Sequence, residues 1–356
     1  MLKKTIPYAF FLFLGLLIFD QFKSDSTKRN KIVNTAEFDY LVSRICFGSC
    51  LKAHRPQPIW DAINSLKPEV FVFLGDNVYA DTENPRQLRK SWEKLGQEPG
   101  FRKLQEQTII QAIWDDHDYG KNDAGKEFSI KEESQQIFLD FFHEPNESQR
   151  RKTPGIYAEK LFGPPGQRVQ LLLLDTRFFR DPLTRAVKRS KHKGPYQPST
   201  DVNSTILGED QWNWVNECLQ KPADLRIVAT SIQFISDKHG WETWGNFPNE
   251  RSKLLNLFKE NGSKNILLLS GDRHSAEFSK IENFLEYPLW DITSSPLNQS
   301  TNKREEENQF RVGSQIFEEN FGMLEIKWMN SNPTVVASIL DVSGNILFSQ
   351  QIIGNH

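Results

Sequence analysis

The segment VFVFLGDNVYAD, residues 70–81, decides the fold because it joins a buried strand to a polar loop. Its first five residues are all apolar and lie between Pro68 and Gly75, which is typical of a strand buried on both faces of a sheet. The polar residues that follow lie at the carboxyl end of the strand, where α/β sheets bind their ligands.

Around this segment, apolar runs alternate with amphipathic stretches, and this alternation predicts an α/β sheet. The predicted strands are 41–49, 70–74, 108–114, 168–175, 226–234 and 265–270. The predicted helices are 57–66, 85–105, 131–143, 210–219 and 249–260. After Ser275 only strand-like pieces and a charged loop, 301–311, remain, so we expect a second, antiparallel sheet stacked on the first. The long connection 180–205 either covers a site or is simply solvated.

Composition places the chain among globular proteins. It has 356 residues, 44 Lys and Arg against 46 Asp and Glu, and a formal net charge of -2. This near-balance excludes a polycationic nucleic-acid binder, and we expect no specific nucleic-acid partner. The three cysteines are too few, and odd in number, for a disulfide scaffold, so at least one thiol is left over. We expect a monomer.

The first residues have the pattern of an export signal or a short membrane anchor. Lys3 and Lys4 precede an unbroken apolar run, residues 6–19, and a polar linker follows. This run suits a signal-peptide core and is shorter than the roughly 20 residues that cross a bilayer comfortably. Residues 1–31 are therefore predicted to be a signal peptide or tether that exports the protein to the periplasm or the exterior. Residues 32–356 are predicted to be a catalytic domain.

Acids, histidines and a thiol gather where four predicted strands end. Their sequences are FGSC (47–50), GDNVYAD (75–81), DDHDYGKND (115–123) and GDRH (271–274). Each alone has a simpler reading: a Gly-Asp pair is commonly a turn, and a lone cysteine is commonly a small core residue. Together they predict one cluster, because carboxyl ends of neighbouring strands meet at one edge. Converging carboxylates repel, so metal ions are expected among them.

The types of ligand narrow the chemistry. Carboxylate and amide oxygens suit Ca, Mg or Mn, histidine suits Zn or Fe, and a thiolate with a phenolate suits Fe(III). A mixed, multinuclear site of this kind fits in-line hydrolysis of phosphate esters by a metal-activated water. No Gly-x-Ser-x-Gly elbow, Walker-type loop or His-Glu-x-x-His helix supports another hydrolase or nucleotide-binding class.

These motifs resemble those of the alkaline phosphatase D, or PhoD-like, family of the calcineurin-like metallophosphoesterase superfamily. The resemblance extends from Cys46 to Leu297. Its carriers are FGSC, LGDNVYAD, WDDHDYGKND, LDTRFFR (174–180), SIQF (231–234), SGDRH and TSSPL (293–297). The resemblance implies a four-layer αββα sandwich of two stacked mixed sheets, secretion, and hydrolysis of phosphate mono- or diesters at a site with iron and calcium.

The resemblance also implies roles for individual residues. Those expected to bind metal are Cys50, Asp76, Tyr79, Asp116, Asp272 and His274. His117 is expected to protonate the leaving group or to steady the phosphoryl group, with Asp116 beside it in the catalytic set. Those expected to bind substrate are Arg177, Asn122, Gln233 and Arg180, the last being equally suited to a surface ion pair.

Three functions remain open from the sequence. The leading hypothesis is an exported metal-dependent phosphatase or phosphodiesterase that acts on a small phosphate ester. The second is a phospholipase-D-like diesterase acting on lipid or nucleic-acid fragments, with the aromatic residues of WETWGNFP (241–248) stacking on the substrate or forming a lid. The third is a non-catalytic domain whose acids merely hold calcium. The role of Asp118 is left open by its position alone.

Overall fold

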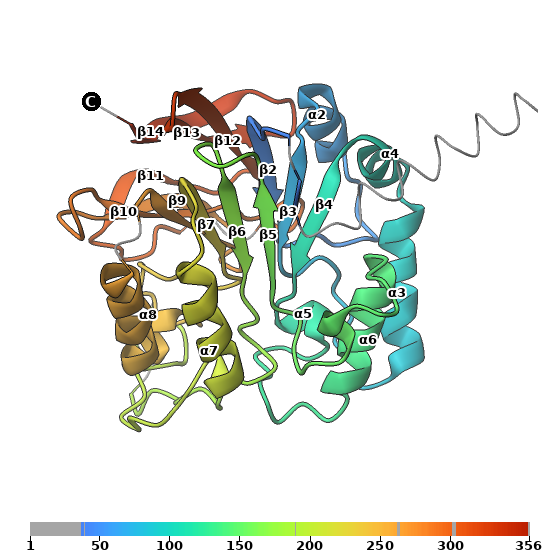
Figure 1. Ribbon diagram of the computed structural model, residues 1–356. Helices are drawn as coiled ribbons and strands as arrows, with labels where there is room; N and C mark the ends of the chain where they lie inside the picture. The colour runs from blue at the N-terminus through green and yellow to red at the C-terminus, as the bar shows by residue number, and fades with distance from the viewer. Residues whose placement is uncertain (1–36, 39, 189, 262–263, 301–303, 355–356) are drawn as a thin grey trace, which may run out of the picture.

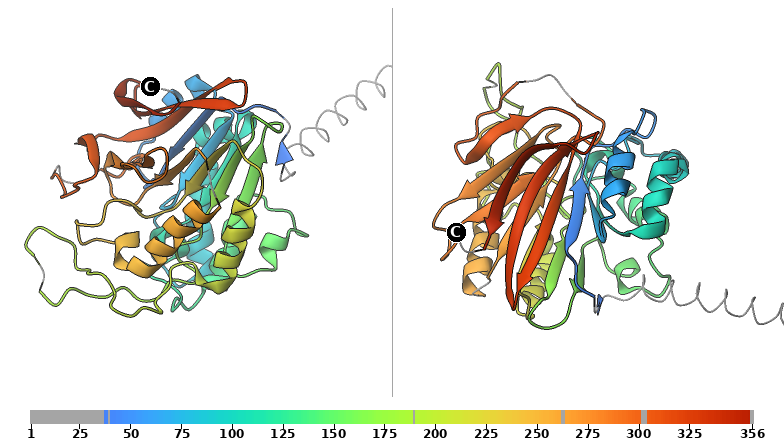
Figure 2. Two further views of the ribbon diagram at one scale, coloured as in Figure 1. Left: turned by 60° about the vertical axis from the view of Figure 1, so that its left-hand side comes forward. Right: turned by 90° about the horizontal axis from the view of Figure 1, so that it is seen from above.

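Two mixed β-sheets packed face to face form the centre of the molecule in the computed structural model (Figure 1). The structure describes residues 37–38, 40–188, 190–261, 264–300 and 304–354. The predicted leader, residues 1–31, lies outside the described residues. Helices α7 and α8 cover one side of the sheet pair and helices α2, α3, α4 and α6 the other, which gives four layers (Figures 1 and 2).

The eight-stranded sheet has the order β1-β5-β6-β7-β8-β10-β9-β11, and the six-stranded sheet has the order β14-β13-β12-β2-β3-β4. The strands of the first are β1 (Glu37–Phe38), β5 (Ala158–Phe162), β6 (Val169–Leu173), β7 (Leu225–Ala229), β8 (Ile266–Ser270), β9 (Ala276–Ile281), β10 (Leu289–Thr293) and β11 (Arg311–Ile316). Those of the second are β2 (Arg44–Gly48), β3 (Val70–Leu74), β4 (Ile109–Ile113), β12 (Asn320–Met329), β13 (Asn332–Asp341) and β14 (Ile346–Ile353). Strands β2, β3 and β4 are parallel, as are β6, β7, β8 and β10. Their carboxyl ends therefore meet at one edge.

The helices connect these parallel strands. They are α2 (Ile59–Leu66), α3 (Pro85–Gln97), α4 (Pro99–Gln107), α5 (Asp116–Tyr119), α6 (Lys131–Phe141), α7 (Gly208–Leu219) and α8 (Pro248–Glu260), with short 3-10 helices η1 (Gln149–Arg151) and η2 (Trp244–Asn246). Asn84 caps α3 by accepting hydrogen bonds from the next backbone amides, and proline occupies the first turn of α3, α4 and α8.

Alternate residues of the central strands enter different parts of the core. In β6, Leu171 and Leu173 belong to the cluster that includes side chains of both sheets, whereas Leu172 packs in the cluster with α7 and α8. Strand β7 repeats the pattern, with Ile227 in the first cluster and Val228 in the second. Because successive side chains of a strand point to opposite faces, a strand that is covered on both faces must be apolar throughout.

Three local predictions were wrong. The helix predicted over 85–105 is two helices, because Glu98 is extended before Pro99, as expected for a residue that precedes proline. The strand predicted over 226–234 ends at Ala229, and the residues after it form a loop. The strands after Ser275 form no separate antiparallel sheet: β9, β10 and β11 extend the first sheet and β12, β13 and β14 the second.

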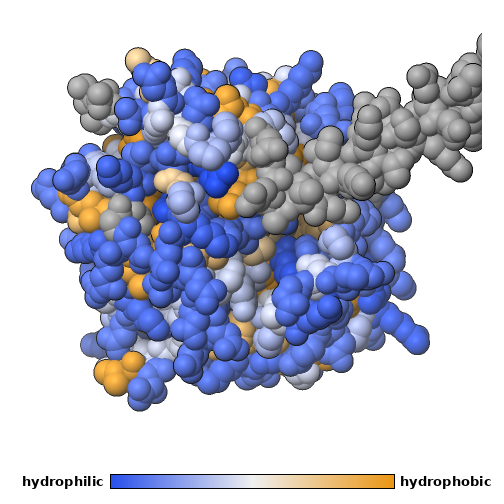
Figure 3. Space-filling view, viewed as in Figure 1, coloured by the Kyte–Doolittle hydropathy of each residue, from blue (hydrophilic) through white to orange (hydrophobic). Residues whose placement is uncertain are grey.

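The three cysteines, Cys46, Cys50 and Cys218, are all free and buried. No helix in the described part of the chain has the length and hydropathy needed to span a membrane. The face seen in Figure 3 is mostly hydrophilic, with hydrophobic residues scattered over it. The polar residues predicted to form a site lie in the loops at the carboxyl edge of the two sheets.

Candidate metal centre

Backbone hydrogen bonds hold the loops at the carboxyl edge together. The amide of Leu51, after β2, donates to the carbonyl of Asp76, after β3, at 2.8 Å. The amide of Gly271, after β8, donates to the carbonyl of Ser231, after β7, at 3.0 Å. Leu297, after β10, donates to the carbonyl of Ser49 at 2.8 Å and so joins the two sheets. The loops predicted to converge therefore do so.

Four of the predicted metal-binding residues in these loops have a left-handed backbone, which residues other than glycine rarely adopt. They are Cys50 (φ 62°), Asp76 (φ 53°), Asp272 (φ 64°) and His274 (φ 52°). Such conformations cost of order 1–3 kcal/mol each and persist where the surroundings impose them, commonly at functional sites. Here they turn the side chains of two sheets toward one another.

Cys50, Asp76, Tyr79 and His274 form one part of the cluster. The Cys50 Sγ lies 3.5 Å from the Asp76 Oδ2, and the Tyr79 hydroxyl donates to the same oxygen at 3.1 Å. The Tyr79 oxygen also lies 2.9 Å from the His274 Nε2. Burial, helped by the Asp272 charge, raises the pKa of the Cys50 thiol to about 12, and burial lowers the pKa of His274 to about 4.

Asp116 and His117 form the second part, at the start of α5. The backbone amide of His117 donates to the Asp116 Oδ1 at 2.8 Å, and the imidazole Nδ1 of His117 lies 2.7 Å from the Asp81 Oδ1. Burial alone would lower the pKa of His117, but the Asp76 charge and the bond to Asp81 raise it to about 10. Burial opposes ionisation of Asp116, yet the charges of His117 and Arg177 lower its pKa to about 2.

Asp76, Asp115 and Asp272 form the third part, in which Arg177 binds one oxygen of Asp115 and Arg273 lies 3.4 Å from Asp272. Burial raises the pKa of Asp76 well above its usual range, and Cys50 and Asp116 raise it further. Burial also raises the pKa of Asp272 to about 7. The Asp115 Oδ2 is buried and has no hydrogen-bond partner among the described residues. A buried carboxylate oxygen without a donor is costly, so these groups are suited to a bound cation.

The donor set fits metal ions. The ligand atoms of Cys50, Asp76 and His274 all lie within 4.8 Å of one another. The same holds within three further groups: Asp76 with Asp116 and His117, Asp76 with Asp115 and Asp272, and Asp116 with Asp123 and Glu242. The first group offers sulfur, nitrogen and oxygen ligands, whereas the third and the last offer carboxylates alone.

Arg177 and Arg180 lie beside this cluster and are fully buried. The Arg177 guanidinium donates to Asp115 from its Nε at 2.6 Å and to Glu242 from its Nη1 at 2.8 Å. The Arg180 Nε lies 3.0 Å from the other Glu242 oxygen. Both arginines are thus engaged with carboxylates, and neither lines the pocket described next.

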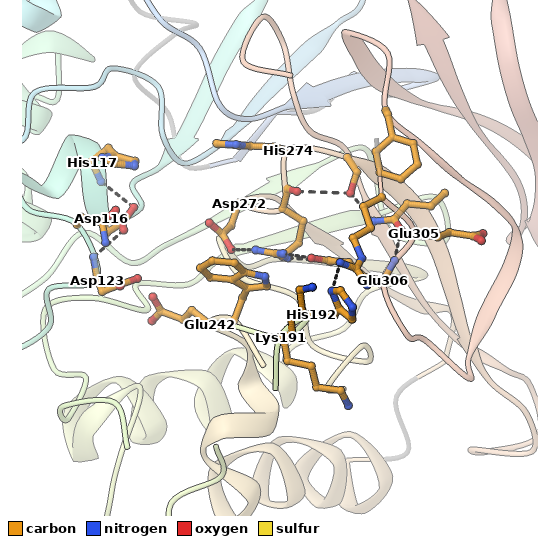
Figure 4. Close-up of a pocket in the computed structure, with 18 residues that line it drawn as sticks. Asp116, His117, Asp123, Lys191, His192, Glu242, Asp272, His274, Glu305 and Glu306 are labelled. Atoms are coloured by element: carbon orange, nitrogen blue, oxygen red, sulfur yellow. Dashed lines mark hydrogen bonds and ion pairs between the residues drawn. The ribbon is translucent and has the colours of Figure 1, made fainter. Parts of the chain in front are cut away.

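A pocket of about 500 Å³ opens over the cluster. Figure 4 shows Asp116, His117 and Asp123 on one side of it and Glu305 and Glu306 on the other. The predicted site residues Asn122, Asp272 and His274 also line it. Gln233 does not: it is buried, and its amide nitrogen donates to Glu277 at 2.7 Å and to Thr293 at 2.8 Å.

Three acidic residues near the cluster were not predicted to belong to the site. Asp81, Asp123 and Glu242 were not singled out, although Asp81 and Asp123 lie within quoted motifs. Asp118 has a clear place: one oxygen accepts from the Asp115 amide at 2.5 Å, and the other accepts from the Asn77 amide at 3.0 Å. It therefore ties the loop after β3 to the loop after β4.

A family model described as PhoD-like phosphatase matches residues 46–344, which is most of the chain. The chain belongs to the PhoD-like phosphatase family. It is 27% identical over 118 residues to alkaline phosphatase D of Bacillus subtilis (strain 168), a match that covers 31% of this chain and 20% of that relative. The chain thus matches about a fifth of the length of this curated relative.

Solved structures with the same fold are related to the chain only distantly in sequence. A structure of PhoD has a TM-score of 0.71 at 16% identity and covers 88% of this chain and 70% of its own. The purple acid phosphatase PPD1 from yellow lupin (Lupinus luteus) has a TM-score of 0.58 at 10% identity and covers 88% of this chain and 54% of its own. These likenesses confirm the predicted four-layer fold.

Proposed function

We propose that this PhoD-like protein is a metal-dependent hydrolase of phosphate mono- and diesters. The observation that carries the proposal is that Asp76 belongs to three of the four candidate metal groups. A carboxylate shared in this way suits a bridge between two cations, which in-line displacement at phosphorus uses to hold the attacking and leaving oxygens. Membership of the phosphatase family supports the same reaction.

We propose iron and calcium as the metals. Cys50, Tyr79 and His274 supply the thiolate, phenolate and imidazole that suit Fe(III), and Asp76 would be shared with it. Asp115 and Asp272, which group with Asp76, and Asp116, which groups with Asp123 and Glu242, supply the hard oxygens that suit calcium. When bound, such cations lower the pKa of a water molecule and offset charge on the phosphoryl oxygens.

The residues of this chain would then orient the substrate and move a proton. Asp81 accepts the Nδ1 proton of His117, so the Nε2 of that imidazole is left to donate a proton to the departing alcohol oxygen. Phosphate binding by Asn122 and Gln233 remains a prediction. So does phosphate binding by Arg177 and Arg180, whose contacts support a positioning role: they hold Asp115 and Glu242 in place.

For the whole chain we propose an exported, monomeric enzyme. Residues 1–31 would act as a signal peptide or membrane tether, which the apolar run 6–19 supports, and residues 32–356 would form the catalytic domain. The natural ester would be a small molecule.

The test uses the full chain purified without chelators. We expect it to contain iron and calcium by elemental analysis and to hydrolyse p-nitrophenyl phosphate and bis(p-nitrophenyl) phosphate. Prolonged chelation should abolish both activities, and readdition of the metals should restore them. Full activity after verified metal removal would contradict the mechanism. Zinc as the only metal would require different ligand assignments, and metal binding without turnover would favour the non-catalytic alternative.

A further inference from the structure

The outer part of the pocket is formed by two loops that the proposed chemistry does not use. One carries Lys191, His192 and Lys193, and the other carries Arg304, Glu305 and Glu306. Figure 4 shows His192, Glu305 and Glu306 on the side of the pocket away from His117. They line the same pocket as His117, so the part of an alcohol group that lies farthest from its ester oxygen would reach them.

The acids of these loops are already paired. Glu306 forms an ion pair with Arg273, and Glu307 lies 2.9 Å from the Nζ of Lys193. Glu305 lies 3.5 Å from the Nη1 of Arg311. Two of these partners are shared, because Arg273 also pairs with Asp272 and Arg311 also pairs with Glu277.

Two cationic side chains of the outer pocket form no ion pair with an acid among the described residues. Lys191 lines the pocket, is exposed, and has no ion-pair partner among the described residues. Arg304 is exposed as well, and its Nη1 hydrogen-bonds to the Nδ1 of His192, which is not an acid. Lys191 and Arg304 thus offer positive charge to which an anionic group of the substrate would be attracted.

Trp241 adds a flat apolar surface to the lining of the pocket. The guanidinium of Arg273 lies over its ring at 5.6 Å from the centroid. The side chain is nevertheless 39% exposed within the lining of the pocket. An exposed indole in a pocket is suited to stacking on a flat ring.

We propose that the preferred substrates are phosphate esters of a flat ring that carries a second acidic group. The ring stacks on Trp241 and the second anion is bound by Lys191 and Arg304. This inference rests on the proposed function and adds the substrate class to it.

The test compares two esters that differ only in the second anion, 2-naphthyl phosphate and 6-sulfonato-2-naphthyl phosphate, with the metal-loaded full chain. Because partly exposed ion pairs contribute little, we expect kcat/KM to favour the sulfonated ester about fivefold. The preference should shrink at high salt, which screens exposed charges. In the double variant Lys191→Ala/Arg304→Ala the ratio should fall to about one.

The control variant is Lys188→Ala, an exposed lysine of the same loop that does not line the pocket and should keep the wild-type ratio. Trp241→Ala should raise KM for both naphthyl esters about fivefold relative to glycerol 2-phosphate. Hydrolysis of both naphthyl esters with a wild-type ratio of one would overturn the inference and leave the proposed function standing. A preference that survives the double variant would overturn the assignment of these two residues. Hydrolysis of neither ester would overturn the proposed function and the inference with it.

Discussion

Two sets of acids lie on neighbouring loops. Asp76 and Asp272 form the first set, and Asp115 and Glu242, which contact Arg177, form the second and receive more positive charge from the protein. Asp115 and Glu242 receive the guanidinium of Arg177, and Arg180 adds a second cation. Asp76 lies among Cys50, Asp115 and Asp116, whereas Asp272 has an ion pair with Arg273 at 3.4 Å, and burial raises the pKa of both. The first set therefore depends more on cations from outside, whereas the second is held mainly by Arg177 and Arg180, with one Asp115 oxygen still without a hydrogen-bond partner among the described residues.

The first prediction concerns Asp76, which belongs to three of the four candidate metal groups and should therefore affect activity most. Asp76→Asn should lower kcat/KM for p-nitrophenyl phosphate more than about 100-fold, beyond the 10–100-fold typical of residues that only support a metal ligand. The same change should raise the melting temperature of the metal-free protein at pH 8, because it removes a buried carboxylate that its neighbours repel. Steady-state kinetics and thermal unfolding with and without metals measure both effects.

Asp175→Asn is the matched control. Asp175 is also buried, but its carboxylate accepts hydrogen bonds from Trp114 at 2.8 Å and from the amides of Ile156, Arg177 and Phe178 at 2.9, 2.9 and 3.0 Å. An asparagine would turn an amide group toward some of these donors, so this variant should lose about 1–3 kcal/mol of stability. Equal destabilisation by both substitutions would contradict the distinction between the two sets.

The second prediction concerns the guanidinium of Arg177, which donates to both Asp115 and Glu242. Arg177→Met leaves the Asp115 carboxylate buried without its guanidinium, so the free energy of unfolding should fall by about 3–5 kcal/mol. Urea denaturation of the metal-free protein measures this loss. The control is Arg89→Met, since Arg89 pairs with Asp140 at 3.0 Å on the surface and should cost less than about 1 kcal/mol. Similar losses for both variants would show that the buried network stabilises no more than a surface pair.

The sequence predicted the residues expected to bind metal better than the network around Arg177. Cys50, Asp76, Asp116 and His274 each follow a strand directly, and the carboxyl ends of parallel strands must share an edge. Spacing alone therefore brought them together. Glu242 lies far from the end of β7, within a loop whose path depends on tertiary packing, so its pairing with Arg177 and Arg180 had no local signal.

The same limit applied to the C-terminal strands. Alternation of apolar and polar residues identifies a strand but not the sheet that it joins. Strand β12 pairs with β2, with Met323 opposite Cys46, and β9 pairs with β10 in the other sheet. These partners are chosen by the shared core of Phe47, Phe321 and their neighbours, which no short window of sequence contains.

The smallest of these effects concerns Asp81, which hydrogen-bonds to His117 and stabilises its protonated form. Asp81 belongs to none of the candidate metal groups among the described residues. Asp76 and Asp81 together raise the pKa of His117 to about 10, so replacing one acceptor must lower that pKa. A histidine that donates a proton is active below its pKa. In Asp81→Asn the alkaline fall of kcat/KM should therefore begin at lower pH, with a loss of about tenfold at the wild-type optimum. Glu83→Gln, which removes an exposed acid paired with Lys121 at 3.6 Å, should leave the profile unchanged. An alkaline limb that does not move in Asp81→Asn would mean that His117 is not the proton donor.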